Sequence, residues 1–323
     1  MGRAGIILIL GSILCARMVL ADTRVLLVGD VMLDRTVATR MKTAKDPLYP
    51  FRHVLPLHET PIGHVDFVVG NLEGPIVTKK RPPVKEIDFG FATSTANGIR
   101  RVGFDAVSQA NNHTLDQGRD GAKESKTFLL QAGVLPFGDQ TKESATSSFA
   151  WIEKNGKRIA LVGFNVTDHL LNKQAALQVI GTATSTNATT IVFMHWGTEY
   201  RARPSNAQIE LAHWFIDAGV SAVIGTHPHW VQSVEMYHGR PIAYSLGNFV
   251  FDQDWSAETR NGLAVALNFG STTTMSLLPV SIERSQPRYL AGKEKEKRLQ
   301  HLAEISGKEF RSEILNGTLS GAP

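Results

Sequence analysis

The chain has 323 residues, of which 34 are lysine or arginine and 30 are aspartate or glutamate, giving a formal net charge of +4. The first 21 residues contain two arginines and no acid, so the remainder has 32 basic against 30 acidic residues and is close to neutral. This balance offers no electrostatic basis for binding nucleic acid, and we expect no nucleic-acid partner. The length suits one elaborated domain or two close ones.

The N-terminal segment, residues 1–21, has the order of features found in an export signal. Arg3 gives a short basic start, residues 6–14 are largely apolar, and Val19-Leu20-Ala21 is similar to a signal cleavage site. The alternative is an uncleaved membrane anchor, for which the apolar stretch is short. We therefore expect an exported protein, located in the periplasm or cell envelope.

Short apolar runs that end in polar residues recur along the chain. They lie at residues 25–28, 66–69, 105–108, 191–194 and 222–224. Runs of this length and composition are typical of strands covered on both faces. Helices are predicted near residues 95–102, 119–132 and 205–218, and the last has an apolar face of Ile209, Ala212, Phe215 and Ile216.

Two hairpins are predicted between these elements. Asn155-Gly156 joins residues 149–152 to 158–162, and His238-Gly239 joins residues 231–237 to 241–246. Parallel-type strands with added hairpins predict an α/β sandwich of two mixed β-sheets with helices outside.

Two other segments complete the predicted organisation. Residues 75–92 contain three prolines and form a loop of the kind that often borders a site. Strands are expected within residues 263–282. A mixed-charge tail is then predicted at residues 284–323, after a domain that spans residues 24–283.

Polar side chains capable of binding a metal follow the predicted strands, where open α/β sheets bind their ligands. They are Asp30, Asn71, Glu73, Asn112, His113, His195, His227 and His229. Carboxylate, amide and imidazole together favour Mn²⁺, Fe or Zn²⁺ over an all-oxygen Ca²⁺ site. Such a set could hold one or two divalent ions.

The motif Thr226-His227-Pro228-His229 is the most informative part of this set. Pro228 fixes its own φ and disfavours helical backbone at His227, so we expect the pair to be extended and to converge on one ion.

Each of these residues also has a structural interpretation. Asp30 and Asn71 could cap turns or helices, Asn112 could stabilise a left-handed turn, His113 could be a core histidine, and Glu73 could be a solvated loop acid. The other histidines, and Trp196 and Trp230, are interpreted as structural or packing residues.

The ordered motifs resemble the CapA family of capsule and poly-γ-glutamate synthesis proteins, within the calcineurin-like metallophosphoesterase superfamily. The resemblance extends from about residue 24 to residue 283. It rests on Gly29-Asp30-Val31-Met32, Asn71-Leu72-Glu73, Asn111-Asn112-His113, His195-Trp196-Gly197-Thr198-Glu199-Tyr200, Gly225-Thr226-His227-Pro228-His229 and Tyr244-Ser245-Leu246-Gly247-Asn248-Phe249.

The resemblance implies a four-layer αββα sandwich with a dinuclear metal site. It makes Asp30 and Asn112 metal ligands, with His195, His227 and His229 as the imidazole ligands. It also makes His113 the group that stabilises or protonates the leaving atom. Two departures from the phosphoesterase pattern stand out: Met32 replaces a histidine ligand, and Asn71-Leu72-Glu73 replaces the Gly-Asp that carries a bridging carboxylate.

Two functions follow as hypotheses. The first is a metal-dependent hydrolase acting on an anionic partner, either a phosphoester or a polyglutamate-type amide. The second, motivated by Met32 and the displaced carboxylate, is a non-catalytic component of a membrane-bound synthesis or export complex. A sandwich without metal is a third alternative.

Overall fold

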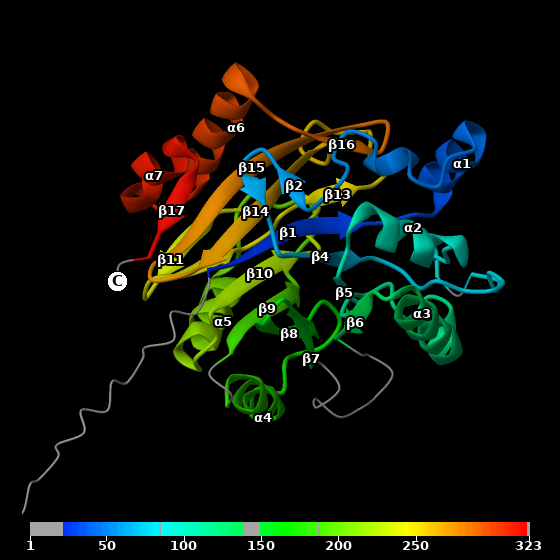
Figure 1. Ribbon diagram of the computed structural model, residues 1–323, viewed down its shortest axis with the longest axis horizontal. Helices are drawn as coiled ribbons and strands as arrows, with labels where there is room; N and C mark the ends of the chain where they lie inside the picture. The colour runs from blue at the N-terminus through cyan, green and yellow to red at the C-terminus, as the bar shows by residue number, and fades with distance from the viewer. Residues whose placement is uncertain (1–21, 84, 139–148, 186–187, 322–323) are drawn as a thin grey trace, which may run out of the picture.

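The computed structural model describes residues 22–83, 85–138, 149–185 and 188–321 (Figure 1). The predicted export signal lies outside the described residues. The described strands form two mixed sheets and a separate ribbon of β2 (Glu59–Thr60) and β3 (Gly63–His64).

The first sheet is built around β1. In spatial order its strands are β16 (Gln286–Tyr289), β15 (Thr273–Glu283), β14 (Asn261–Phe269), β1 (Thr23–Val31), β4 (Phe67–Leu72), β5 (Ala106–Ser108) and β6 (Leu135–Phe137), with β13 (Asn248–Val250) paired to β1 and β17 (Thr318–Ser320) paired to β15. The strands from β1 to β6 are parallel, whereas β14 to β17 add antiparallel pairs.

The second sheet repeats this plan. In spatial order its strands are β11 (Val234–Tyr237), β12 (Arg240–Ala243), β10 (Ala222–Thr226), β9 (Thr189–His195), β8 (Lys157–Asn165) and β7 (Phe149–Lys154). The strands from β12 to β8 are parallel, and β11 and β7 join them as antiparallel partners. These antiparallel pairs are the two hairpins predicted from Asn155-Gly156 and His238-Gly239.

Helices cover the outer face of each sheet, which gives the expected four layers (Figure 1). The first sheet is covered by α1 (Arg35–Ala44), α2 (Ser94–Val102) and α3 (Gly118–Ala132), and the second by α4 (Lys173–Thr184) and α5 (Asn206–Asp217). Single turns of 3₁₀ helix lie at Tyr49–Phe51 and Lys308–Phe310. The three predicted helices correspond to α2, α3 and α5, whereas α1 and α4 were not predicted.

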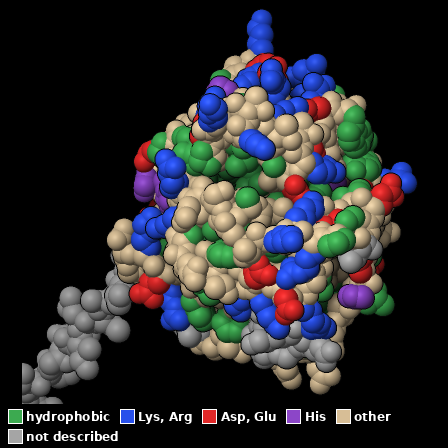
Figure 2. Space-filling model, turned by 90° about the vertical axis from the view of Figure 1, so that its right-hand side faces the viewer, with side chains coloured by type: hydrophobic (Ala, Val, Ile, Leu, Met, Phe, Trp, Pro, Cys, Tyr) green, Lys and Arg blue, Asp and Glu red, His purple; other side chains and the backbone are tan. Residues whose placement is uncertain are grey.

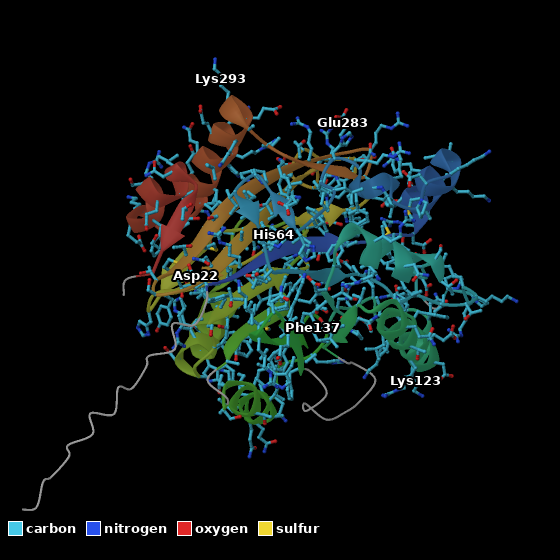
Figure 3. All side chains as sticks on the ribbon, viewed as in Figure 1. Asp22, His64, Lys123, Phe137, Glu283 and Lys293 are labelled. Carbon is cyan, nitrogen blue, oxygen red and sulfur yellow. The ribbon has the colours of Figure 1, made fainter. Side chains whose placement is uncertain are left out.

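Side chains of β1 show why its sequence is an unbroken apolar run. Val25 and Leu27 point into the core between the sheets, and Leu26 and Val28 point into the core beneath the helices. Across the inner core, Phe137 of β6 meets Phe193 of β9 edge to face, with ring centroids 5.5 Å apart. Figure 3 shows Phe137 inside the molecular outline. Apolar contacts on both faces therefore fix the sheets to each other and to the helices.

The C-terminal segment corrects the predicted domain boundary at residue 283. Residues 286–320 supply β16 and β17 to the first sheet, together with α6 (Gly292–Ile305) and α7 (Arg311–Asn316). Leu299 and Leu302 of α6 are buried in the inner core, whereas Lys293 at its start projects outward (Figure 3). The charged residues that suggested a tail occupy the solvent face of an amphipathic helix.

Candidate metal centre

Three parallel strands of the first sheet bring their polar residues to one edge. Asp30 lies near the end of β1, Asn71 near the end of β4 with Glu73 just beyond it, and Asn112 and His113 lie in the turn after β5. The carboxyl ends of parallel strands share one edge of a sheet, so polar residues that follow different strands in the sequence lie close together in space.

A close backbone approach fixes the end of β1. A Cβ atom at Gly29 would lie 1.9 Å from the carbonyl oxygen of Gly247. The neighbouring Asp30 N–H donates to that same oxygen at 3.0 Å, and Asp30 is in register with Asn248 of β13. Glycine is therefore required at position 29, because any larger residue would push Asp30 away from β13.

Three histidines from the second sheet face this edge. His195 is the last residue of β9, and His227 and His229 follow β10. The ring centroids of His195 and His227 are 4.7 Å apart, and those of His227 and His229 are 6.1 Å apart. All three are buried. The centre therefore lies between the sheets and draws on both.

The two acids are fully buried and linked by one amide. Asn71 Nδ2 donates to Asp30 Oδ1 at 2.8 Å and to Glu73 Oε2 at 3.4 Å. The other end of this amide, Asn71 Oδ1, accepts from Asn111 Nδ2 at 3.0 Å. The structure thus places Asn71 as a donor that holds the two carboxylates together, while Glu73 reaches into the centre as the sequence suggested.

His229 contacts both acids. Its Nδ1 lies 3.2 Å from Asp30 Oδ2 and 3.0 Å from Asn248 Oδ1, and its Nε2 lies 3.7 Å from Glu73 Oε1. The amide of Asn248 donates elsewhere through Nδ2, so its oxygen accepts the Nδ1 proton of His229. Nε2 then carries the lone pair, which faces Glu73 and is free to bind a cation.

The turn that carries His227 and His229 differs from the extended conformation we predicted. His227 has φ = 94° and His229 has φ = 58°, both in the left-handed region. Pro228 disfavours right-handed helical backbone at His227, and we expected an extended conformation there for that reason. His227 instead adopts left-handed backbone, which also avoids the right-handed helical region. Left-handed backbone at a non-glycine residue is strained, so contacts with the surrounding residues must hold this turn in place.

Burial controls the electrostatics of the centre. It raises the pKa of Glu73 well above the ordinary value, and the charge of Asp30 adds to this effect. Burial lowers the pKa of His195 well below its ordinary value, and burial together with His229 lowers the pKa of His227 to about 4. The imidazoles of His195 and His227 are thus neutral, which is the form that binds metals.

The described residues fit a divalent cation at this point. Asp30, Glu73 and His195 each offer a ligand atom, and these atoms lie within 4.8 Å of one another. Within the described chain, the buried atoms Glu73 Oε1 and His227 Nδ1 have no hydrogen-bond partner. Buried polar atoms are normally satisfied, and a cation held by Asp30, Glu73 and His195 would satisfy the carboxylate oxygen of Glu73. His195 Nε2 also lies 2.9 Å from Asn112 Oδ1, which brings Asn112 to the same point.

His113 is held at the border of this group by residues on two loops. Its Nδ1 lies 2.7 Å from Asp116 Oδ2, and its Nε2 faces Glu73 Oε1 at 4.0 Å. Lys85 Nζ pairs with Asp116 Oδ1 at 2.7 Å, and the ring of Phe89 packs on His113 with centroids 4.2 Å apart. Lys85 and Phe89 belong to the loop at residues 75–92, so this loop packs against His113 and Asp116.

The pKa of His113 reflects two opposing effects. Burial lowers it, and the hydrogen bond and charge of Asp116 act against burial. Asp116 therefore orients the ring with Nδ1–H toward itself and leaves Nε2 facing the centre.

Several residues of the centre were not predicted as site residues. They are Asn111, Asp116, Glu199, Thr226 and Asn248. Asp116 lies outside every motif named above, and its only local signal is that it follows His113 by three residues; the other four lie within those motifs. Asn248 reaches His229 through pairing of β13 with β1, which no local pattern reveals.

Met32 does not replace the missing imidazole. It is fully buried in the core between the first sheet and its helices.

Trp196 is buried and donates from Nε1 to the carbonyl of Tyr244 at 2.8 Å, which confirms its interpretation as a packing residue. Among the other histidines, His58 pairs with Asp105 and His213 with Glu235, away from the centre.

In the described residues, no helix is both long enough and apolar enough to cross a membrane.

The family model described as bacterial capsule synthesis protein PGA_cap matches residues 24–253. The capsule biosynthesis protein CapA of Bacillus anthracis is 30% identical over 286 residues, which cover 81% of this chain and 68% of that protein. The PGA biosynthesis protein CapA of Bacillus subtilis is 30% identical over 280 residues, covering 80% and 72%.

Among solved structures, the NAD nucleotidase of Haemophilus influenzae aligns with a TM-score of 0.44 and 11% identity, covering 88% of this chain and 57% of that one. The family model matches well over half of the chain and agrees with the similarity to the two Bacillus proteins, which covers about four fifths of this chain. The chain belongs to the bacterial capsule synthesis protein PGA_cap family.

Proposed function

We propose that this protein is a metal-dependent hydrolase of the cell envelope that acts in the synthesis or export of a capsule or poly-γ-glutamate-type exopolymer. Its substrate is a phosphoester or a polyglutamate-type amide. The observation that carries the proposal is the pair of buried, unsatisfied atoms Glu73 Oε1 and His227 Nδ1 beside Asp30 and His195. The names of the Bacillus relatives supply the connection to exopolymer.

The residues of this chain divide into ligands and a proton carrier. Asp30, Glu73 and His195 would hold a divalent ion, with His227, His229 and Asn112 beside them. When bound, such an ion activates water and polarises the oxygen of the bond to be cleaved. His113 would give a proton from Nε2 to the leaving atom, while Asp116 keeps the ring in the required orientation.

Basic side chains near the centre suit an anionic substrate. Lys85 lies at its border, where it donates to the carbonyl of Asn112 at 2.9 Å. Arg35 pairs with Asp252 and lies over the rings of Phe89 and Phe251, and Phe251 in turn packs against His229. Figure 2 shows Lys and Arg side chains spread widely over the face that carries α1, α2 and α3. These cations would attract a phosphoester or a polyglutamate chain.

The experiment measures turnover by the full chain with and without Mn²⁺ or Zn²⁺. Probe substrates are a nitrophenyl phosphomonoester, a nitrophenyl phosphodiester and a γ-linked glutamate oligomer. We expect metal-dependent cleavage of at least one probe. His113→Asn should reduce turnover by about 10²-fold or more while metal content is unchanged. His169→Asn, at an exposed position, is the control. A folded, metal-loaded protein that cleaves none of the probes would exclude hydrolysis of these bonds.

One observation favours a second function. Met32 lies in the apolar core, where it offers no ligand to the centre. This supports a non-catalytic role as part of a membrane-bound synthesis or export complex. In cells, His113→Ala would then leave exopolymer production intact. Loss of exopolymer, with the variant protein at normal abundance, favours the hydrolase.

A further inference from the structure

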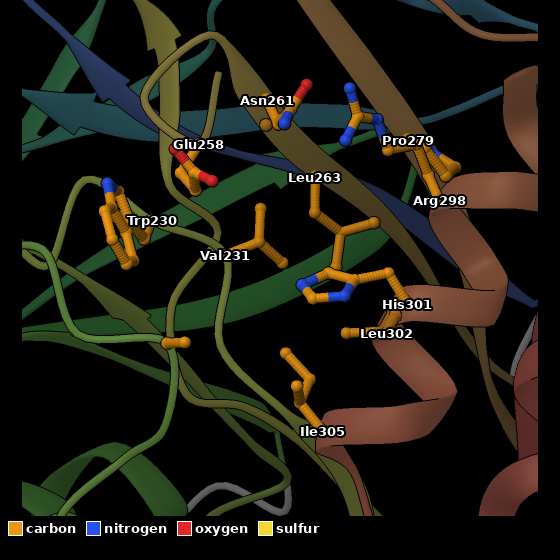
Figure 4. A pocket seen from close by; sticks show the side chains of 12 residues that line it. Trp230, Val231, Glu258, Asn261, Leu263, Pro279, Arg298, His301, Leu302 and Ile305 are labelled. Atoms are coloured by element: carbon orange, nitrogen blue, oxygen red, sulfur yellow. The ribbon is translucent and has the colours of Figure 1, made fainter. Parts of the chain in front are cut away.

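A second pocket lies away from the metal ligands, between α6 and the segment that follows His229. We call it the α6 pocket. It has a volume of about 180 Å³, and its apolar wall comes from Val231, Leu263, Leu302 and Ile305, with Trp230 at one end (Figure 4). The segment that forms its far side, α6, was outside the domain predicted from sequence, so no motif pointed to this pocket.

Trp230 connects the α6 pocket to the metal centre without merging them. It directly follows His229, and its ring centroid lies 6.4 Å from that of Tyr200. The ring of Tyr200 in turn lies 6.0 Å from that of His229. None of the predicted metal ligands lines the pocket. Trp230 thus lines the α6 pocket and is linked to His229 through the ring of Tyr200, while the polar groups of the two sites are separate.

The principal charge in the α6 pocket belongs to Arg298. Figure 4 shows its side chain extending from α6 toward Asn261, above Leu263. Arg298 is partly buried, and burial lowers the pKa of its guanidinium. In the described part of the chain, no side chain forms a hydrogen bond or a close ion pair with it, and Glu258 and Glu294 act on it only as nearby charges.

Glu258 also lines the pocket, and its sign opposes that of Arg298. Glu258 is exposed, so water screens its charge, whereas the guanidinium of Arg298 has lost part of its hydration. The unpaired and partly desolvated group has more to gain from a partner of opposite charge. The balance of the pocket therefore favours an anion.

The volume of the pocket limits the size of the apolar group that an anionic ligand can carry. A cavity of about 150 Å³ lined by aliphatic and aromatic side chains holds one benzene molecule. The α6 pocket is slightly larger, and its lining adds the polar side chains of Glu258, Asn261, Arg298 and His301 to an apolar wall. We propose that the α6 pocket binds an organic acid whose apolar body, about the size of one benzene ring, lies against Leu263 and Leu302 and whose carboxylate pairs with Arg298.

Calorimetric titration of the full chain, treated with chelator to remove metal, tests this proposal. The probes are benzoate, benzylamine and toluene, which share a ring and differ in charge. We expect benzoate to bind at least tenfold more tightly than benzylamine, with toluene between them. Equal or tighter binding of benzylamine would mean that Glu258 dominates, and the proposal would be wrong.

Two charge variants sharpen the test. Arg298→Gln should weaken benzoate binding at least tenfold, and Glu258→Gln should leave it unchanged or tighten it. Lys297→Gln removes a neighbouring, exposed charge from the same helix and should change binding less than twofold. If Lys297→Gln weakens benzoate binding as much as Arg298→Gln, the effect is long-range attraction and the proposed ion pair is refuted.

Two further variants locate the bound probe. Ala202 lies at the exposed margin of the pocket, so Ala202→Trp should fill the entrance and abolish benzoate binding without disturbing the core. This variant also decides the matter if Arg298→Gln unfolds. Glu73→Gln alters only the metal centre and should leave benzoate affinity unchanged. Loss of binding in Glu73→Gln but not in Ala202→Trp would place benzoate at the metal centre and overturn the proposal.

Discussion

Replacement of Glu73 by glutamine tests whether the buried acids form a metal site. Glutamine keeps the shape of the side chain and removes its charge. In the metal-free parent, burial and Asp30 raise the pKa of Glu73 above 4.5. The folded state therefore holds a proton more tightly than the unfolded state, so the parent loses stability as the pH rises from 4.5 toward the folded pKa. Metal-free Glu73→Gln should not show this loss.

When metal is bound, we expect the parent to be more stable to unfolding than Glu73→Gln. At a free metal concentration about 100 times the Kd, the parent gains about 2.7 kcal/mol. This corresponds to a rise in Tm of about 5–10 °C, at roughly 2–4 °C per kcal/mol for a chain of this size. Loss of an outer-sphere partner weakens metal binding about 10–100-fold, so loss of a ligand should weaken it by at least about 100-fold. At the same metal concentration, the variant should gain only about 0.4 kcal/mol, or about 1–2 °C.

Differential scanning calorimetry with Mn²⁺ and Zn²⁺, between pH 5 and pH 8, measures both effects. Glu153→Gln, at an exposed position on β7, is the matched control and should respond as the parent does. If Glu73→Gln keeps the full metal-induced rise in Tm, Glu73 is not a ligand and the assignment of the centre is wrong. If the metal-free variant is less stable than the parent at pH 8, the burial argument is wrong.

Three further changes test other parts of the structure. Asp116→Asn should lower turnover of a cleaved probe by about 10²-fold with unchanged metal content, because His113 loses its charged orienting partner; a fall in metal content instead would assign Asp116 to the metal site. For Asp105, burial acts to raise the pKa, but hydrogen bonds from His58 and the Val68 N–H hold it below the ordinary value. Asp105→Asn should therefore cost about 2 kcal/mol near pH 7 in urea unfolding, and this difference should vanish as the pH falls through the folded pKa. Phe193→Ala should cost about 3–5 kcal/mol by removing the edge-to-face contact between the sheets; a cost below about 1 kcal/mol would contradict tight packing there.

The fold was predictable where local patterns are strong. Apolar runs that end in Gly29-Asp30, in Asn71 or in His195 identify the parallel strands, and Asn155-Gly156 identifies a hairpin. The strand ends also indicated which residues would meet, because parallel strands share a carboxyl edge.

The parts that were missed depend on contacts between distant segments. Asn248 joins the centre because β13 pairs with β1, and Gly29 permits that pairing. The buried face of α6 is narrow, and the charged residues around Leu299 and Leu302 conceal it in the sequence. The left-handed backbone of His227 is set by its surroundings, which local preferences at a pre-proline residue do not specify.

The central position of β1 constrains the order in which the protein can fold. This strand is the first in the described chain, yet its neighbours on the two sides are β4 and β14, with Thr23 opposite Phe269. Residues Thr23–Leu27 of β1 therefore lack their partner on one side until residues 261–269 have been synthesised. Pairing over such a sequence separation is slow, and an unpaired apolar strand is prone to aggregate. The first sheet can therefore be completed only after the C-terminal part of the chain has been synthesised.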